Sequence, residues 1–256
     1  MRLEELLGIL GHLAETADLS EPFLVGGFPR DRRLGKLPTQ VEDIDLTTGD
    51  KDSLALALLA SRQWQDAAFR SYDDGHVSLS FKNIRMDFSN HFVLPGIDAE
   101  LVKRGITEPT NLQREMFSRD FTVNTLLQPM NLSREPGDPT GMGLADLEAK
   151  LLRTPVDPDL TIGHDSRRIL RALKLSLRLG FRIDEDLGKA MLKYRGAVGQ
   201  LSAGHVRRQV HQMFHLDSRK AIELLSEYKL LPIIPLSRLM AMEMAKHRMI
   251  QHLLDS

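Results

Sequence analysis

The 256-residue sequence contains no cysteine. This absence excludes disulfide bonds, thiolate catalysis and zinc sites with cysteine ligands, and it fits a protein of a reducing cytosol. The sequence also lacks an apolar run of the roughly 20 residues that a membrane-spanning helix needs. The N-terminal segment MRLEELLGILGHLAE has acidic residues among its leucines and no basic start, so it predicts an amphipathic helix and no secretion signal. We therefore expect a soluble, cytoplasmic protein.

Charge is distributed unevenly along the chain, although the formal net charge is only −1. Residues 151–256 hold 18 Lys and Arg against 11 Asp and Glu, a net charge of +7, while residues 1–150 hold 16 against 24, a net charge of −8. Such a division is expected when one part of a protein binds nucleic acid. On charge alone, chance and a solvated helical surface explain it equally well.

The chain shows two sequence patterns, one typical of strands and then one typical of helices. In residues 22–90, short apolar and β-branched runs predict four strands, which begin at Phe23, Ile44, Val77 and Ile84. Asp52 is placed to cap a helix between the second and third strands. From about residue 143, helical periodicity predicts helices over 143–151, 165–179, 185–195, 203–215, 218–231 and 236–254. Prolines and glycines in 90–112 and 131–142 predict irregular connections.

The fold expected from this pattern is α+β. A head with a small mixed β-sheet flanked by helices, residues 1–130, is followed by an all-helical region, residues 131–256. The hydrophobic fraction of 42% allows a sizeable core in one large domain or two small ones.

A strand that runs into two glycines is the first candidate binding element, Leu24-Val25-Gly26-Gly27-Phe28-Pro29-Arg30-Asp31. Glycines let the backbone approach a ligand closely, and the free N–H groups at a helix N-terminus favour phosphate. Arg30 would add positive charge. Taken alone, such a pair marks a turn more often than a phosphate site.

Two aspartates lie two residues apart on the next predicted strand. Because side chains alternate between the faces of a strand, Asp43 and Asp45 point to the same face with their backbones about 7 Å apart. Oxygen ligands of this kind suit Mg²⁺, with substrate phosphates completing its coordination. An isolated pair is more often a solvent-facing acidic strand end. If the strand that carries Asp87 is a neighbour, three carboxylates would form a two-metal site for phosphoryl transfer.

Three further blocks follow in the sequence. They are Arg119-Asp120-Phe121-Thr122-Val123-Asn124, Asp138-Pro139-Thr140-Gly141-Met142-Gly143-Leu144-Ala145-Asp146-Leu147 and Asp165-Ser166-Arg167-Arg168-Ile169-Leu170-Arg171-Ala172. Together with the glycine turn and the aspartate pair, they make five ordered blocks across residues 23–181. In this order they resemble the tRNA nucleotidyltransferase and bacterial poly(A) polymerase family, within the class II nucleotidyltransferase superfamily.

The resemblance implies roles for the residues in the head. Asp43 and Asp45 would bind Mg²⁺ and activate an RNA 3′-hydroxyl for attack on the α-phosphate of CTP or ATP. Arg119 would bind phosphate or base, and Asp120 and Asn124 the ribose. Without the resemblance, the block that starts at Arg119 reads as a helix cap with a solvated arginine.

The resemblance also implies that the helical block with Asp165 and Arg168 selects the base of the incoming nucleotide. Asp165 and Arg168 are three residues apart on a predicted helix and share a face, where a carboxylate and a guanidinium can read the Watson–Crick edge of one base. In the family this pair selects the incoming nucleotide, and Arg171 belongs to the same nucleotide-binding block. On spacing alone, a helix salt bridge is favoured.

Three positions depart from the family's motifs. Ser118 stands where the first arginine of R-R-D is expected, and His164 stands where a glutamate precedes the template aspartate. Gly204-His205 replaces the charged pair of the family's Ser-x-Glu-Arg-Ile helix signature. We expect these departures to bear on base selection. Isolated histidines of this kind are more often plain surface or core residues than metal ligands or acid–base groups.

The C-terminal part is short for the family. Residues 219–235 resemble its neck, but no body or tail domain follows. This predicts a compact natural form, a cut chain, or a protein whose further RNA contacts come from a protein partner or a second copy of itself.

The sequence therefore predicts a template-independent RNA nucleotidyltransferase that adds C, A or both to an RNA 3′ end. We favour tRNA 3′-CCA addition or part of it, with poly(A) polymerase as an alternative because the shared residues do not separate them. A catalytically inactive relative that binds RNA or nucleotide is the alternative from another class. A small-molecule nucleotidyltransferase is disfavoured, because the helical template block would then have no purpose.

Overall fold

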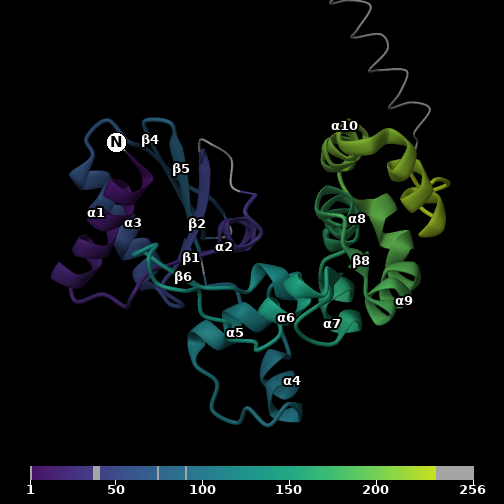
Figure 1. The fold of residues 1–256 in the computed structure, drawn as a ribbon, viewed down its shortest axis with the longest axis horizontal. Helices are drawn as coiled ribbons and strands as arrows, with labels where there is room; N and C mark the ends of the chain where they lie inside the picture. The colour runs from purple at the N-terminus through teal and green to yellow at the C-terminus, as the bar shows by residue number, and fades with distance from the viewer. Residues whose placement is uncertain (1, 37–40, 74, 90, 235–256) are drawn as a thin grey trace, which may run out of the picture. The chain divides into compact units, whose positions relative to one another are not determined.

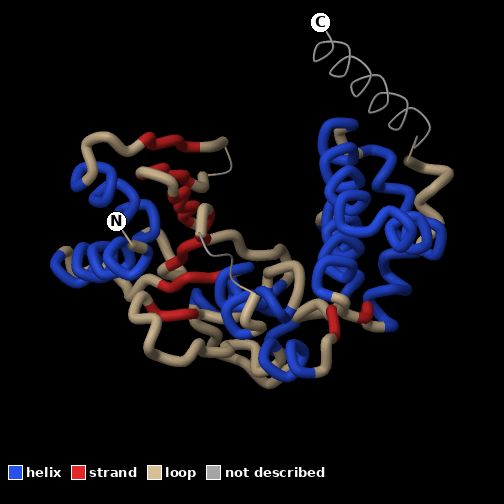
Figure 2. Tube along the Cα trace, turned by 45° about the horizontal axis from the view of Figure 1, so that its top comes forward, coloured by secondary structure: helices blue, strands red, loops and turns tan. Residues whose placement is uncertain are grey.

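The computed structural model describes residues 2–36, 41–73, 75–89 and 91–234. The chain divides into two compact units, Met1–Asp157 and Pro158–Ser256. The first unit contains the sheet, and the second is almost entirely helical (Figures 1 and 2). This confirms the predicted α+β head followed by a helical region.

The first unit contains, in chain order, α1 (Leu3–Thr16), β1 (Phe23–Val25), α2 (Gly27–Arg33), β2 (Asp43–Thr47), α3 (Asp52–Gln63), β3 (Ala68–Ser71), β4 (Val77–Phe81), β5 (Ile84–Phe88), α4 (Ile97–Lys103), α5 (Asn111–Phe117), a 3₁₀ helix (Thr122–Asn124), β6 (Gln128–Pro129), α6 (Gly143–Glu148) and β7 (Leu151–Leu152). The four predicted strands are β1, β2, β4 and β5. The irregular structure predicted over 90–112 is wrong in part, because α4 and the start of α5 lie there.

The sheet has six strands in the order β3-β4-β5-β2-β1-β6. Strands β2 and β5 pair in parallel, and the other neighbours are antiparallel. The sequence did not predict β3 or β6. All four side chains of the edge strand β3 are exposed, so it lacks the alternation of apolar and polar residues that marks a half-buried strand. Strand β6 has only two residues.

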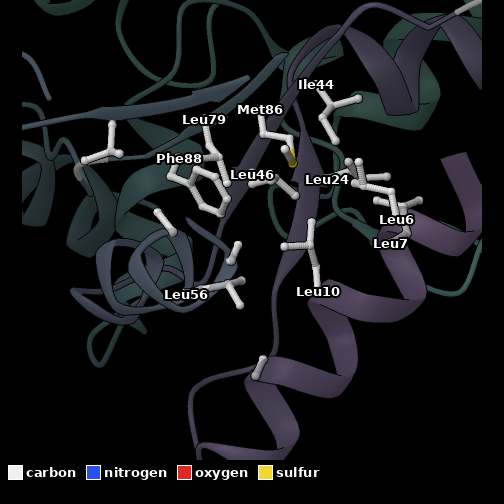
Figure 3. Close-up of a cluster of buried hydrophobic side chains, with 14 of the residues drawn as sticks. Leu6, Leu7, Leu10, Leu24, Ile44, Leu46, Leu56, Leu79, Met86 and Phe88 are labelled. Atoms are coloured by element: carbon white, nitrogen blue, oxygen red, sulfur yellow. The ribbon is translucent and has the colours of Figure 1, made fainter. Parts of the chain in front are cut away.

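One face of the sheet is buried under α1 and α3 (Figure 1). The predicted amphipathic helix is confirmed, because α1 buries one stripe of its surface against the sheet. Figure 3 shows this core, in which helix residues Leu6, Leu7, Leu10 and Leu56 pack against strand residues Leu24, Ile44, Leu46, Leu79, Met86 and Phe88. Since side chains alternate along a strand, burial of Ile44 and Leu46 directs Asp43 and Asp45 to the opposite face.

The second unit contains α7 (Pro158–His164), α8 (Arg167–Leu179), β8 (Arg182–Ile183), α9 (Glu185–Tyr194), a 3₁₀ helix (Arg195–Gln200) and α10 (Ala203–Glu227). Asp217 interrupts α10 with extended backbone angles, so two helical segments meet there, as predicted. Its carboxylate accepts a hydrogen bond from the Lys220 backbone N–H (3.0 Å) and caps the second segment. The helix predicted over 236–254 lies outside the described residues.

The first compact unit extends beyond residue 130, where the sequence placed the boundary. Residues 131–157 pack with the head: Gln128 donates from Nε2 to the Arg134 carbonyl (2.9 Å), and Leu127 pairs with Gly137 as an isolated β-bridge. A functional division at residue 130 stays a prediction. Among the described residues, no helix has the length and apolar character needed to span a bilayer.

Candidate active site

Gly26 forms the turn between β1 and α2. Its φ of +71° lies in the region that L side chains rarely adopt. A Cβ atom at this position would lie 2.7 Å from Asp45 Oδ2 and 3.6 Å from Arg119 Nη1. The positive φ therefore favours glycine, and a side chain at this position would have to move the carboxylate of Asp45. The Asp45 carboxylate and the Arg119 guanidinium both reach this turn. The structure thus brings together three residues from three predicted motifs.

The three candidate carboxylates share the face of the sheet that points away from the core. In the parallel pair of β2 and β5, Asp45 lies opposite Asp87, and Asp43 lies opposite Arg85. Asp43 and Asp45 are exposed. Asp87 is half-buried and accepts hydrogen bonds from Ser78 Oγ (2.6 Å) and Arg85 Nε (3.0 Å). The strand of Asp87 therefore lies beside the strand of Asp43 and Asp45, which was the condition for bringing the three carboxylates to one face.

This donor set fits a magnesium ion. Mg²⁺ is usually held by one or two carboxylates and completes its octahedron with water and substrate phosphates. Asp43 and Asp45 supply exposed carboxylates on a rigid strand. Over the described ranges of the chain, no group of three acidic or histidine side chains is placed to hold a metal ion. The three-carboxylate metal group that the sequence expected from Asp43, Asp45 and Asp87 is therefore not formed here, and Asp43 and Asp45 are the residues that would hold an ion.

A buried carboxylate that the sequence analysis missed lies behind Arg119. Glu115 is 3% exposed and accepts hydrogen bonds from Thr47 Oγ1 (2.7 Å), Ser89 Oγ (2.9 Å) and Arg119 Nη2 (3.2 Å). His91 Nδ1 lies 3.5 Å from its Oε2 atom. Burial raises the pKa of Glu115, but the contact with His91, the charge of Arg119 and the two hydroxyl donors outweigh it and lower the pKa. Glu115 thus joins the ends of β2 and β5 to Arg119.

A local sequence signal could have located Glu115. Thr110 and Gln113 form a capping box at the start of α5: Gln113 N donates to Thr110 Oγ1 (3.1 Å), and Thr110 N donates to Gln113 Oε1 (2.9 Å). A helix that begins there carries Glu115, and Arg119 follows four residues later, just after α5 ends at Phe117. The partners Thr47 and Ser89 come from distant strands and have no local signal.

Arg30, Asn124 and Asp120 form a buried chain of hydrogen bonds. Arg30 is 4% exposed and donates from Nε to Asp31 (2.7 Å) and from Nη1 to Asn124 Oδ1 (2.5 Å). Asn124 Nδ2 donates to Asp120 Oδ1 (2.9 Å). The Arg30 guanidinium also lies behind Gly27, where a Cβ atom would be 3.3 Å from its Nη2. Arg30 therefore supports two predicted ribose-binding residues from inside the fold.

Two of the motif positions are explained by packing. Ser118 is 1% exposed; its hydroxyl donates to the Arg114 carbonyl (2.7 Å) and accepts from the Leu94 backbone N–H (2.8 Å). Gly143 leaves no space for a side chain, because a Cβ atom would lie 2.8 Å from the Thr122 carbonyl oxygen. Thr122 Oγ1 also donates to Asp146 (2.6 Å), which ties the 3₁₀ helix to α6.

The predicted base-selecting residues lie in the second unit. The sequence placed Asp165 on a helix, but this prediction is wrong. Asp165 lies between α7 and α8, and α8 begins at Arg167. The partner of its carboxylate is Arg167, whose Nε (2.8 Å) and backbone N–H (3.0 Å) donate to Oδ1. Burial raises the pKa of Asp165, but these bonds and the charges of Arg167 and Arg168 lower it. Arg168 is buried, and Arg171 is exposed on α8.

Comparison with known proteins now decides the family. Residues 22–153, which include β1 to β7, match the family described as the poly(A) polymerase head domain. The chain belongs to the tRNA nucleotidyltransferase and bacterial poly(A) polymerase family. The head of this chain is thus a class II nucleotidyltransferase head, in agreement with the resemblance of its motifs.

Relatives of this head are named for different activities. An A-adding tRNA nucleotidyltransferase of Aquifex aeolicus is 27% identical over 81% of this chain and 24% of its own length. A CC-adding tRNA nucleotidyltransferase of Halalkalibacterium halodurans is 26% identical over 84% of this chain and 50% of its own length. The solved structure of the Thermotoga maritima CCA-adding enzyme with tRNA is 23% identical, covers 90% of this chain and 51% of its own, and gives a TM-score of 0.70. This likeness shows the fold. The chain spans about half or less of the length of these proteins.

Proposed function

We propose that this chain carries a template-independent RNA nucleotidyltransferase that adds C, A or both from CTP and ATP to an RNA 3′ end. The observation that carries the proposal is that the Asp45 carboxylate and the Arg119 guanidinium lie 2.7 Å and 3.6 Å from the same point beside Gly26. A carboxylate that can hold a divalent cation and a guanidinium that can bind phosphate are what the transfer of a nucleotidyl group requires. The family to which the head belongs supports this reading.

In the proposed reaction the RNA 3′-oxygen attacks the α-phosphorus of the triphosphate. A bond forms between these two atoms, the bond from the α-phosphorus to the bridging oxygen breaks, and pyrophosphate leaves with that oxygen. Mg²⁺ at Asp43 and Asp45 would supply charge neutralisation and a lowered pKa of the 3′-hydroxyl. Asp87, which shares their face, is the third candidate catalytic carboxylate.

The other head residues would bind and orient the nucleotide. Arg119 would bind its phosphates, held in place by Glu115. Asp120 would accept a hydrogen bond from a ribose hydroxyl, and Asn124 would donate one to the ribose. Arg30 holds the amide of Asn124 in place through its hydrogen bond to Oδ1. Gly26 and Gly27 would let the backbone approach the triphosphate.

Base selection would fall to Asp165 and Arg168, with Arg171 beside them on α8. The lowered pKa of Asp165 keeps its carboxylate ionised and able only to accept hydrogen bonds at neutral pH. Cytosine and adenine both carry an exocyclic amino group, which donates to such an acceptor. This pair therefore suits the two bases of CTP and ATP.

Addition to the 3′ end of tRNA is the proposed form of the activity. Relatives that cover most of this chain are named for adding CC or A to tRNA. Poly(A) synthesis is the alternative within the same chemistry. An inactive relative that binds RNA or nucleotide is favoured by one observation, namely that Ser118 is buried in packing where the motif has an arginine.

An extension assay tests the proposal. Transcripts of tRNA ending before CCA, after C and after CC are offered CTP, ATP or both, with Mg²⁺. We expect extension that stops at CCA or at part of it, and loss of extension with Asp45→Asn, which keeps the size of the side chain but removes its charge. Asp98→Asn, at an exposed acid of α4, is the matched control. A long A ladder would indicate poly(A) polymerase; no extension of any RNA, with nucleotide binding intact, would indicate the inactive relative.

A further inference from the structure

Arg85 is a cation beside the candidate metal ligands that the proposed reaction does not use. We call the sheet face that carries Asp43, Asp45 and Asp87 the carboxylate face. Arg85 lies opposite Asp43 in the parallel pair of β2 and β5, and it precedes Asp87 by two residues on the same strand. Since side chains two residues apart share one face of a strand, its guanidinium lies on the carboxylate face.

The Arg85 guanidinium is bound to Asp87. Its Nε and Nη2 atoms each lie 3.0 Å from Asp87 Oδ1. Ser78 on the neighbouring strand β4 donates from Oγ to the same oxygen (2.6 Å) and accepts from Arg85 Nε (2.9 Å). One oxygen of Asp87 therefore accepts from three donor atoms, and a metal ion at that oxygen would have to displace them.

The charge of Asp43 also acts on Arg85. Burial lowers the pKa of Arg85, but the charge and the hydrogen bond of Asp87 outweigh it and, with the charges of Tyr72 and Asp43, raise the pKa. Arg85 thus interacts favourably with carboxylates on both parallel strands. A divalent cation at Asp43 would be repelled by the same guanidinium, because like charges a few ångströms apart oppose each other.

This cation gives a physical reason for the missing three-carboxylate group. The sequence predicted that Asp43, Asp45 and Asp87 would hold metal together, whereas no three acidic or histidine side chains among the described residues are placed to do so. Carboxylates that share a site repel one another unless a cation lies between them. On the Asp87 side, a guanidinium of the protein itself supplies that cation.

We propose that Arg85 is an internal counter-charge that competes with divalent cations for Asp87, so that Asp43 and Asp45 alone hold an exchangeable metal ion. The purpose of that ion rests on the proposed function, but the competition does not depend on turnover. In two-metal sites a second cation balances the charge of such carboxylates. Here the guanidinium does so, and the role of Asp87 narrows to holding Arg85.

Binding of Mn²⁺ without nucleotide or RNA tests the competition. Electron paramagnetic resonance measures the free Mn²⁺ that remains as MnCl₂ is titrated into the protein. Arg85→Gln removes the charge from a side chain that is 45% exposed. We expect it to lower the Kd for Mn²⁺ on the order of tenfold, because a repelling charge is lost and Asp87 is released. Adding Asp87→Asn to this variant should return the Kd toward that of the wild type.

Two further variants separate the local contact from net charge and folding. Arg85→Lys keeps the charge and should keep most of the competition. Arg62→Gln removes the same charge from an exposed position of α3, the helix that covers the opposite face of the sheet, and should leave the Kd unchanged. Urea unfolding should show similar stability for all these variants, because exposed ion pairs contribute little to the free energy of unfolding.

Equal Kd values for Mn²⁺ in the wild type and Arg85→Gln would overturn the proposal, as would an equal change in Arg85→Gln and Arg62→Gln. A higher KM for CTP in Arg85→Gln, with unchanged Mn²⁺ binding, would also overturn it and would assign Arg85 to phosphate binding.

Failure of the proposed function has a different signature. A wild type that extends no RNA, with the expected difference in Mn²⁺ affinity between the variants, would overturn the activity and leave the competition. A wild type that extends RNA, with no difference in Mn²⁺ affinity, would overturn the competition alone.

Discussion

Glu115 Oε1 accepts a hydrogen bond from Arg119 Nη2 at 3.2 Å, and the same guanidinium extends its Nη1 toward Gly26 and the carboxylate of Asp45. Arg119 thus lies between a buried carboxylate and the carboxylate expected to hold the metal ion. Glu115 is a positioning residue in this arrangement, because it touches Arg119 and has no place at the reacting atoms.

Glu115→Gln should loosen Arg119 in a chain that is less stable but still folded at pH 7. The glutamine carbonyl can still accept from Thr47 or Ser89, but the charge that attracts Arg119 is lost. We expect the KM for nucleotide to rise on the order of tenfold, about 1.4 kcal/mol, with a smaller change in kcat. Steady-state kinetics with CTP and ATP measure the two effects. In a double-mutant cycle with Arg119→Lys, additive effects would contradict the positioning role.

The pH dependence of stability should carry the signature of Glu115. Its pKa is lower in the folded than in the unfolded chain, so its ionised form stabilises the fold above the unfolded value of about 4.3. This contribution is lost as the pH falls through the folded pKa. Urea unfolding should show a large loss of stability from Glu115→Gln at pH 7 and a smaller loss at pH values below the folded pKa. Glu223→Gln, at an exposed acid, should show no such difference; an equal loss from Glu115→Gln at both pH values would contradict the argument.

Gly26→Ala should inactivate the protein more than its strain alone explains. Gly105 offers a matched control, because its φ of +79° is similar but no atom lies within 4 Å of the position of an added Cβ. Both substitutions should cost about 1 kcal/mol in backbone strain. Only Gly26→Ala should displace Asp45, and we expect its kcat to fall on the order of a hundredfold. If the two variants were equally active, the position of Asp45 beside Gly26 would not matter for catalysis.

Arg168→Ala should change base choice. Its guanidinium is buried at the start of α8, next to Asp165, whereas Arg182 on β8 is exposed. We expect the ratio of kcat/KM for CTP and ATP to change by about tenfold, the effect of losing one or two hydrogen bonds to a base. Arg182→Ala should leave this ratio unchanged. An unchanged ratio in Arg168→Ala would count against base selection by this residue.

Local pattern was sufficient to predict the parts of the fold in which one face is buried. Alternation around Ile44 and Leu46 predicted β2 and placed Asp43 and Asp45 on the opposite face, and helical periodicity predicted the break of α10 near Asp217. The helix α7 was missed because it is short, although Asp157 and Pro158 are a typical start signal.

Apart from Glu115, which the capping box at the start of α5 could have located, the supporting residues of the site could not be predicted from local pattern. Thr47 and Ser89 meet Glu115 across 68 and 26 positions of the chain, and no local pattern marks these two hydroxyl residues as its partners. Arg30 illustrates the same difficulty. Its place after the glycine turn suggested a cation open to phosphate, but its partners Asp31 and Asn124 bury it.

The alignment of Asp45 with Asp87 across β2 and β5 makes assembly of the site part of folding itself. A slip of one residue in either strand would turn its carboxylates into the apolar core and expose its buried side chains to water. Such a misaligned head would be strongly disfavoured, because it buries carboxylates and exposes apolar side chains. We therefore expect an incompletely folded head to lack the carboxylate face altogether. The face that carries the three carboxylates therefore forms only when β2 and β5 pair in the correct register.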